Sequence, residues 1–511
     1  MMVGVEREVK LVAPSGFGLP ALDGVIKGAV AGPASHRRLD ATYYDCADLR
    51  LARAGVTLRY RTGEHDPVWT LKLPGGETGS ALSRRELDFV GSPETVPEEA
   101  RDLIRAYLRS AALVGVARLV TERCAVGVCD PHRRETVEVA NDLVTAYDGH
   151  RQVQFREVEV EVKTGKLGGK GLVRGVVARL EAAGCRVEPP IPKLIRALGP
   201  PAQAPADIVV PALTDTATIQ ELIHHAVARS VARIVQHDAG VRLGEDPEQV
   251  HQFRVAARRL RSDLRTFAPL LDARWVEFLR AELRWLGRAV GVVRDCDVLA
   301  ERLGAQAATL AAVDAVARLL HQLAGHAQQA HAAMLCALRS ARYDALLDAL
   351  VEAAHQPRFT QTGPQPATGW AAELVRGPWR RLAHAVRALQ ANPSDEALHT
   401  VRILAKRCRY AAEAVVPVAG QRAERFAGAI AQIQTVLGDH QDTVVAEAWL
   451  RAAATAAPDN GVAAGELIAG QRAHRACLRT QWPATWDKAS DKTLRTWLST
   501  HGKATAKGVV R

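Results

Sequence analysis

One block of sequence occurs twice in the second part of the chain, and this repeat constrains the fold more than any other feature. A histidine and a row of basic residues in HQFRVAARRLR recur with the same internal spacing in HTVRILAKRCR. The paired positions are His251 with His399, Arg254 with Arg402, Arg258 with Lys406, Arg259 with Arg407, and Arg261 with Arg409. Further on, Gly291 and Asp295 recur as Gly438 and Asp442. Because long repeats with matched spacing fold as repeated structural units, we expect a duplicated domain.

Each copy of the block places its basic residues on one side of a helix. Positions i, i+3, i+7 and i+10 lie close together on a helical face, so each copy forms one cationic strip. The strips are His251, Arg254, Arg258 and Arg261 in the first copy, and His399, Arg402, Lys406 and Arg409 in the second. A solvated basic face is the alternative for a single helix of this kind, but the duplication favours binding of an anion. Arginine chelates phosphate oxygens with a planar fork of donors, so such a row suits a polymer with regularly spaced phosphates.

The hydrophobic pattern changes near residue 195. Before it, short runs such as TLRYRT and REVEVEV alternate apolar and polar residues, which predicts an antiparallel, mainly β domain. After it, long stretches rich in Ala, Leu and Arg have apolar residues three and four apart, which predicts an all-α domain. The predicted limits are 1–197 for the β domain, 198–214 for a Pro-rich linker, 215–485 for the helical domain with halves 215–355 and 369–485, and 486–511 for a basic C-terminal tail.

Composition narrows the functional classes. With 48% hydrophobic and 24% charged residues the chain is a folded protein, and its net charge of +11 favours anionic partners. Its eight cysteines form no CxxC pair, and the sequence has no signal-peptide core and no long apolar run. We therefore expect a reduced, cytoplasmic protein without a membrane span. Arginine strips also suit nucleic acid, but only 5% of the residues are aromatic, which provides no stacking platform and argues against that partner.

Charged residues occupy every second position in several strands of the β domain. The first and last long strands carry Glu6, Glu8 and Lys10, and Glu157, Glu159 and Glu161, respectively. Strands between them carry Arg59, Arg61, Lys72, Glu86 and Arg123. One solvated sheet face explains any single strand, but six such strands are better explained by a closed barrel with a polar interior. Carboxylates inside it can hold Mg²⁺ or Mn²⁺, while arginine and lysine neutralise the phosphate oxygens of a substrate.

These motifs resemble two known families. The HxxRVxxRRLR block, WLGRAVGVVRDCDVL and their second copies resemble the CHAD domain over about residues 215–485. That resemblance implies two antiparallel four-helix halves whose basic helices bind inorganic polyphosphate. The leading ExExK, YYDCADLRL, LRYR, TLKLP and the closing EVEVE resemble the CYTH superfamily of triphosphate tunnel metalloenzymes over about residues 3–197. This second resemblance implies an eight-stranded antiparallel tunnel with flanking helices that binds a triphosphate group end-on.

The CYTH resemblance also implies roles for individual residues. The implied metal ligands are Glu6, Glu8, Glu157, Glu159 and Glu161. The implied catalytic residues are Glu6, Glu8, Lys10, Arg59 and Arg61. The implied phosphate contacts are Lys72, Arg85, Arg123 and Lys193, with Arg84 as the alternative to Arg85 because the face of that strand is uncertain by one residue. Asp142 is left out, because Leu143 follows it where the family pattern has a glycine.

The function that follows is a metal-dependent phosphohydrolase acting on inorganic triphosphate or another compound ending in a triphosphate. Its helical domain would bind long-chain polyphosphate and could associate the protein with polyphosphate granules. One alternative is a polyphosphate-binding and targeting protein whose barrel has no turnover. A less favoured alternative is a class IV-type adenylate cyclase, since the CYTH superfamily also includes such enzymes.

Overall fold

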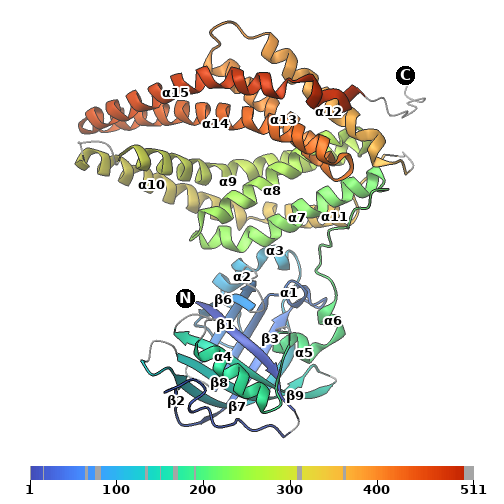
Figure 1. Cartoon of the computed structure of the whole chain (residues 1–511), viewed down its shortest axis with the longest axis vertical. Coiled ribbons are helices and arrows are strands. Elements are labelled where there is room, and N and C mark those ends of the chain that lie inside the picture. Colours follow the sequence, from blue (N-terminus) through green and yellow to red (C-terminus); the bar gives the residue numbers. More distant parts are fainter. Residues whose placement is uncertain are drawn as a thin grey trace. The chain divides into compact units, whose positions relative to one another are not determined.

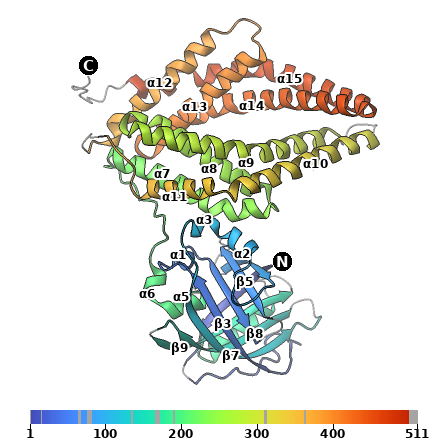
Figure 2. The same cartoon turned by 180° about the vertical axis from the view of Figure 1, so that it is seen from behind.

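The chain divides between Asp207 and Ile208 into two units, at a point inside the Pro-rich segment 198–214. This computed structural model describes residues 2–14, 16–63, 67–74, 82–132, 136–149, 151–164, 171–188, 191–307, 313–360 and 364–499 (Figures 1 and 2). The proline-rich segment itself contains a one-turn helix, α6 (Pro200–Gln203). Proline is tolerated there because the first turn of a helix leaves its backbone N–H groups without intrahelical partners.

Within the described ranges, eight long strands of the first unit form a closed antiparallel barrel. They are β1 (Met2–Val12), β3 (Ser35–Asp45), β4 (Thr57–Thr62), β5 (Val68–Pro74), β6 (Leu82–Phe89), β7 (Val114–Cys129), β8 (Thr136–Tyr147) and β9 (Gln152–Thr164). Their order is β1-β6-β5-β4-β3-β7-β8-β9, and β9 pairs with β1 to close the ring. The short strands β2 (Val30–Ala31) and β10 (Arg186–Val187) pair with β7 and β1. The predicted antiparallel tunnel fold is therefore confirmed.

The apolar residues of the barrel strands face outward, where helices cover them. Helix α4 (Leu172–Ala182) packs Val176 and Leu180 against Val158 and Val160 of β9, and all four side chains are fully buried. Because neighbouring residues of a strand point to opposite faces, this packing turns the glutamates between these valines into the barrel. Shorter helices lie around the remaining surface: α1 (Arg50–Arg53), α2 (Glu98–Leu103), α3 (Arg105–Leu108) and α5 (Lys193–Leu198).

The second unit is all-helical and contains two halves of matching order. The first half comprises α7 (Ile219–Leu243), α8 (Pro247–Thr266), α9 (Ala273–Ala307), α10 (Val313–Leu338) and α11 (Ala341–His355). The second half comprises α12 (Ala367–Arg387), α13 (Asp395–Ala419), α14 (Gln421–Ala456) and α15 (Gly461–Ala489). The halves form two layers, in which α8 contacts α13 (Figures 1 and 2). The predicted duplicated helical domain is confirmed, with α8 and α13 carrying the two copies of the basic block.

The helical unit continues beyond residue 485, where the sequence predicted that a basic tail begins. Helix α15 reaches Ala489, and the short helices α16 (Lys492–Arg495) and η3 (Thr496–Ser499) follow it. Trp486 stacks on Trp379 of α12, and Trp497 packs edge-on against Phe426 of α14. These aromatic contacts hold residues 486–499 to the domain, so the predicted start of the tail is corrected. Among the described helices, none combines the length and the apolar character that a bilayer span requires.

Candidate functional site

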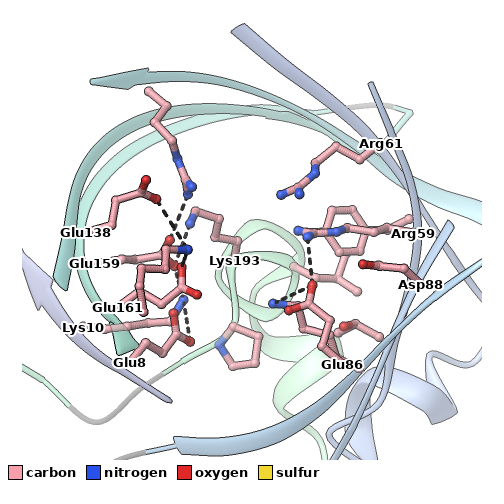
Figure 3. Close-up of a pocket in the computed structure, with 17 residues that line it drawn as sticks. Glu8, Lys10, Arg59, Arg61, Glu86, Asp88, Glu138, Glu159, Glu161 and Lys193 are labelled. Atoms are coloured by element: carbon pink, nitrogen blue, oxygen red, sulfur yellow. Dashed lines mark hydrogen bonds and ion pairs between the residues drawn. The ribbon is translucent and has the colours of Figure 1, made fainter. Parts of the chain in front are cut away.

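The interior of the barrel is a charged cavity of about 250 Å³. Its lining includes seven cationic and six anionic side chains (Figure 3). The cations are Lys10, Arg59, Arg61, Lys72, Arg123, Lys163 and Lys193, and the anions are Glu8, Glu86, Asp88, Glu138, Glu159 and Glu161. A charged interior of this kind is incompatible with a hydrophobic core and points to a bound polar ligand.

One wall of the cavity is formed by β4, β5 and β6 and carries three cations. Arg59 and Arg61 project from β4 into the cavity, where Figure 3 shows both labelled side chains. Glu86 of β6 lies 3.7 Å from Arg59 and 3.5 Å from Lys72 of β5, so its single carboxylate sits between these two cations. Arg59 also donates to the Tyr43 hydroxyl at 3.4 Å. Such fixed guanidinium and ammonium groups can bind phosphate oxygens.

The opposite wall carries a row of carboxylates across three adjacent strands. Glu8 of β1 is the direct cross-strand partner of Glu161 of β9, which is in turn the partner of Glu138 of β8. Lys163 lies 2.7 Å from Glu161 and 3.8 Å from Glu138, and Lys10 lies 3.5 Å from Glu8. These carboxylates therefore lie across the cavity from the cations of the first wall (Figure 3).

Lys193, the first residue of α5, reaches into a buried group of carboxylates at one end of this wall. Its ammonium lies 2.9 Å from Asp142, 2.9 Å from Glu157 and 2.7 Å from Glu159. Burial opposes charge on Lys193, but these three carboxylates outweigh it and raise the pKa of Lys193 well above its usual value. Burial likewise opposes ionisation of Glu159, and Lys10, Lys193 and Arg123 together hold the pKa of Glu159 well below its usual range. Lys193 and Glu159 are therefore both charged at neutral pH.

Arg123 completes this cluster and explains the role of Asp142. Its guanidinium forms a fork with both oxygens of Asp142, at 2.8 and 2.7 Å, and a further bond of 3.0 Å to Glu159. Asp142 and Glu157 are direct cross-strand partners and are almost completely buried. Two adjacent buried carboxylates need cations beside them, which Lys193 and Arg123 supply. Asp142 thus fixes the orientation of two cavity cations.

The structure places most, but not all, of the predicted barrel residues in this cavity. Glu6 and the alternative Arg84 lie outside the described side chains. Glu157 points to the same side as Glu159 but contacts Lys10, Lys193 and Arg196 rather than lining the cavity. Arg85 is corrected: it alternates with the cavity residues Glu86 and Asp88 along β6 and lies on the other face. The one-residue ambiguity in the face of this strand caused that error.

Several cavity residues had been given no role in the predicted site. Glu138 and Asp88 line the cavity beside residues that were predicted, as does Lys163. The sequence signal for them is the two-residue period: Glu138 lies four residues before Asp142, and Lys163 two residues after Glu161. Only the pairing of β8 with β9 shows that Glu138 stands beside the EVEVE strand, because this contact is not local in sequence.

The carboxylate wall offers the oxygen donors that hard divalent cations prefer. Glu8, Glu138 and Glu161 face one cavity from adjacent strands, so their residue types and shared direction fit Mg²⁺ or Mn²⁺. Across the described part of the chain, no three His, Cys, Asp or Glu side chains are arranged as a preformed metal cluster. Lysines occupy part of the wall instead, with Lys10 on Glu8 and Lys163 on Glu161.

The helical unit contains a second charged cavity, of about 390 Å³, at which the two basic strips meet. Six of the eight predicted strip residues line it: His251, Arg254, Arg258, His399, Arg402 and Lys406. Arg294 and Arg302 of α9 add two further cations, and Asp295 and Asp442 are the carboxylates in the lining. The Nε atoms of Arg258 and Arg402 are buried with no hydrogen-bond partner among the described residues. Buried donors without partners indicate space for an anionic ligand.

The glycine and aspartate of each repeat are explained by the arginine that crosses them. A Cβ on Gly291 would lie 3.7 Å from the Arg254 guanidinium, and a Cβ on Gly438 would lie 3.5 Å from Nε of Arg402. Arg254 donates to Asp295 at 2.8 Å, and Asp442 acts on Arg402 with its negative charge. In each repeat the arginine side chain therefore packs against a glycine of the neighbouring helix, where no Cβ is in the way. This packing places the guanidinium in the cavity lining.

Lys406 is the most perturbed cation of this cavity. Burial, followed by the charges of Arg258, Arg402, Arg254 and Arg261, lowers the pKa of Lys406 to about 6. The first repeat has an arginine, Arg258, at the equivalent position. The cavity thus contains one cation that can lose its proton near neutrality.

The other two predicted strip residues lie outside the cavity lining. Arg409 forms an ion pair with Glu413 one turn further along α13, at 2.5 Å. Arg261 faces a separate group of arginines formed with Arg280, Arg284 and Arg407. Each strip continues past the cavity because its helix has 20 or more residues, of which only three strip side chains line the cavity.

A closed barrel with a charged interior, joined to a duplicated helical domain with two facing basic strips, defines the class of protein. The CYTH domain model matches residues 5–170, and the CHAD domain model matches residues 225–451. The chain belongs to the family of proteins in which a CYTH domain is followed by a CHAD domain, as the sequence predicted.

The chain is also similar to individual proteins. The uncharacterized protein MT2285 of Mycobacterium tuberculosis (strain CDC 1551 / Oshkosh) is 31% identical over 471 residues, which cover 86% of this chain and 87% of the relative. Two solved structures are similar to parts of the chain. PptA from Streptomyces chartreusis is 27% identical and covers 52% of this chain and 98% of its own, with a TM-score of 0.45. The CHAD domain from the plant Ricinus communis is 25% identical and covers 56% and 96%, with a TM-score of 0.46.

Proposed function

We propose that the barrel hydrolyses inorganic triphosphate, or another compound ending in a triphosphate, with the help of a divalent cation. In the same proposal the helical unit binds inorganic polyphosphate. The observation that supports hydrolysis is the division of the barrel cavity into two walls, with cations on β4 and β5 and a row of carboxylates on β1, β9 and β8. Carboxylates beside a phosphate site serve a purpose when they hold metal, because a simple polyanion binder gains nothing from them.

The residues of the two walls have different parts in the proposed reaction. Glu8, Glu138 and Glu161 would hold Mg²⁺ or Mn²⁺, which supplies Lewis-acid stabilisation of charge on phosphate oxygens. Arg59 and Arg61 would bind the oxygens of the transferring phosphoryl group and stabilise the charge that develops there. These side chains are held in place before the substrate arrives, so little reorganisation is needed during the reaction.

At the other end of the wall, Lys193 and Arg123 would neutralise the remaining phosphates. Both are fixed by Asp142, so their positions are determined by a buried ion-pair network rather than by the substrate. A rigid cationic end would orient the phosphate chain and leave its terminal phosphorus beside the carboxylate row. Water would then attack that phosphorus, and the displaced phosphate oxygen would leave toward Lys10 or Lys193.

A non-catalytic barrel is the second candidate, and one observation favours it. Lys10 lies 2.6 Å and Lys193 2.7 Å from the same oxygen of Glu159. Two ammonium groups on one carboxylate leave that carboxylate with less attraction for a metal. In this reading the cavity holds a phosphate chain without hydrolysis, and the protein binds or localises polyphosphate.

Phosphate release distinguishes the two candidates. The full-length protein would be assayed on tripolyphosphate, ATP and thiamine triphosphate with Mg²⁺ or Mn²⁺, beside Glu8→Gln and Glu161→Gln. Glu122→Gln is the matched control, because Glu122 lies on β7 with an exposed side chain and outside the cavity lining. We expect metal-dependent release that each cavity variant lowers at least about 100-fold, equivalent to about 2.7 kcal/mol, and that the control retains. Absence of release from every substrate, with polyphosphate still bound, would favour the second candidate.

A further inference from the structure

A group of five arginines lies in the helical unit outside the cavity that the two strips enclose. Its members are Arg261 and Arg265 of α8, Arg280 and Arg284 of α9, and Arg407 of α13, and together they are called the arginine cluster. Their charges act on one another: burial and then Arg407, Arg280, Arg261 and Arg284 lower the pKa of Arg265 to about 10. Burial, Arg284 and Arg407 lower the pKa of Arg280 in the same way.

The arginine cluster has little negative charge near it. None of its five guanidinium groups forms an ion pair with a carboxylate of the described residues, and Nε of Arg280 is buried without a hydrogen-bond partner there. Glu277 acts on Arg280 through its charge but does not reach ion-pair distance. Five like charges without a counter-charge are unfavourable in the free protein, so the cluster is suited to an anion with several charges.

The cluster is continuous with the strip cavity. Arg258 lines the cavity, and its charge also acts on Arg261, the next residue of the same cationic strip along α8 and a member of the arginine cluster. From Arg258 to Arg265 the helix advances about 10 Å, and from Arg254 about 16 Å, at 1.5 Å per residue. An extended polyanion that fills the cavity can therefore continue along α8 into the cluster.

At the aligned positions of the second half, the described residues form no equivalent cluster. The alignment of the two repeats places Glu413 opposite Arg265, and Ala427 and Ala431 opposite Arg280 and Arg284. Glu413 forms ion pairs with Arg409 and Arg259, which are the repeat partners of Arg261 and Arg407. The matching region of the second half is thus neutralised by its own carboxylate. The charged side chains of the two halves therefore correspond within the cavity but differ beyond it.

Three other arginines of the second half are also paired with a carboxylate, unlike those of the arginine cluster. Arg451, Arg472 and Arg475 all bind Glu447, at 2.9, 2.7 and 2.8 Å. The hydrogen bond from Arg472 is the largest effect that lowers the pKa of Glu447, and those from Arg451 and Arg475 add to it. Although burial opposes the shift, the pKa falls to about 2. These arginines are satisfied within the protein, whereas those of the arginine cluster are not.

We propose that the arginine cluster is a second phosphate-binding segment through which a long polyphosphate chain leaves the strip cavity, always on the side of the first repeat. This proposal rests on polyphosphate binding by the helical unit, and it adds that the site distinguishes long chains from short ones. A short chain would be bound by the cavity alone. A longer chain would gain the additional contacts of the cluster and would be held in one direction.

The test is to measure the affinity of the full-length protein for polyphosphate preparations of short, medium and long mean chain length. Arg280→Ala with Arg284→Ala should weaken binding of long chains at least about tenfold and leave short chains unaffected. In this double variant the slope of log affinity against log salt concentration for long chains should become smaller by about 1.4 to 1.8, because two phosphate contacts are lost. The matched control is Arg451→Ala with Arg472→Ala, which removes the same charge from two exposed arginines that Glu447 already satisfies.

Each outcome separates this proposal from the one on which it rests. Arg254→Ala with Arg402→Ala should abolish binding of every chain length, and failure to do so would refute polyphosphate binding in the cavity itself. If that pair abolishes binding but Arg280→Ala with Arg284→Ala leaves the affinity unchanged at every chain length, only the proposal about the arginine cluster is refuted. An equal loss for short and long chains, or an equal loss in the Arg451 and Arg472 control, would also refute it. Circular dichroism of each variant would confirm that the helices remain folded.

Discussion

Lys406 should make polyphosphate binding depend on pH in a way that a single substitution removes. With its pKa lowered to about 6 by burial and by the arginines around it, Lys406 is mostly neutral in the free protein at pH 7.5. A polyanion in the cavity screens those arginines and favours the ammonium form, so the pKa of Lys406 rises toward 10.5, its ordinary value. Binding therefore takes up a proton, and the affinity should fall as the pH rises above about 6.

The size of this effect follows from the pKa difference. In the pH range where Lys406 is neutral in the free protein and charged in the complex, each rise of one pH unit lowers the affinity for polyphosphate tenfold, or by about 1.4 kcal/mol. Between pH 6.5 and 8.5 the loss is therefore as large as about 100-fold, or about 2.7 kcal/mol. His251 adds little above pH 7.5, because burial and then the charge of Arg294 lower the pKa of His251 below its ordinary value.

The matched variant is Lys406→Arg, because the first repeat already has Arg258 at the equivalent position. Arginine does not titrate in this range, so the variant should lose the pH dependence that wild type shows above pH 7.5. Changes in the charge of polyphosphate itself are common to both proteins and cancel in the comparison. Calorimetry in two buffers of different ionisation enthalpy should show uptake of up to one proton in wild type and less in the variant. Equal pH slopes for the two proteins would refute this reasoning.

Three further predictions concern the barrel and the glycine contacts. Lys193→Met should lower the free energy of unfolding by about 3–5 kcal/mol at pH 7, measured by denaturant titration, because Asp142, Glu157 and Glu159 would stay buried with one cation fewer beside them. A loss below about 1 kcal/mol would contradict this role. Gly438→Val should weaken polyphosphate binding at least about tenfold by displacing Arg402, while Gly438→Ala, with its Cβ 3.5 Å from that side chain, should bind nearly normally. Chelation of divalent cations should stop phosphate release and leave polyphosphate binding unchanged; release that continues would remove the metal from the proposed reaction.

In the barrel, most of the fold and part of the site could be predicted from alternation alone. Glu8 and Lys10 on β1, and Glu159 and Glu161 on β9, are two residues apart. Residues at this spacing in a strand lie on the same face. Arg85 shows where this reasoning fails, because a shift of one residue moves a side chain to the opposite face. Asp142 was left out on a family pattern, yet it is the buried partner of Lys193 and Arg123.

In the helical unit, the repeat predicted both strips and the duplicated domain. It did not predict that Arg409 would bind Glu413 while its counterpart Arg261 would face other arginines. The difference arises from contacts between helices that lie far apart in sequence. Nor did it explain the repeated glycines, whose reason is the arginine that crosses each of them.

The sequence by itself determined the periodicities: two residues for the barrel strands, about 3.6 for the helices, and the spacing of the repeat. These are local properties of the backbone, so they decide which side chains share a face. Only the tertiary structure decided which faces meet. It brought Glu138 beside Glu161, Lys193 onto Asp142, and the strips of α8 and α13 into one cavity. Charges and pKa values in these sites depend on distances between segments remote in sequence, and such distances exist only once the chain has folded.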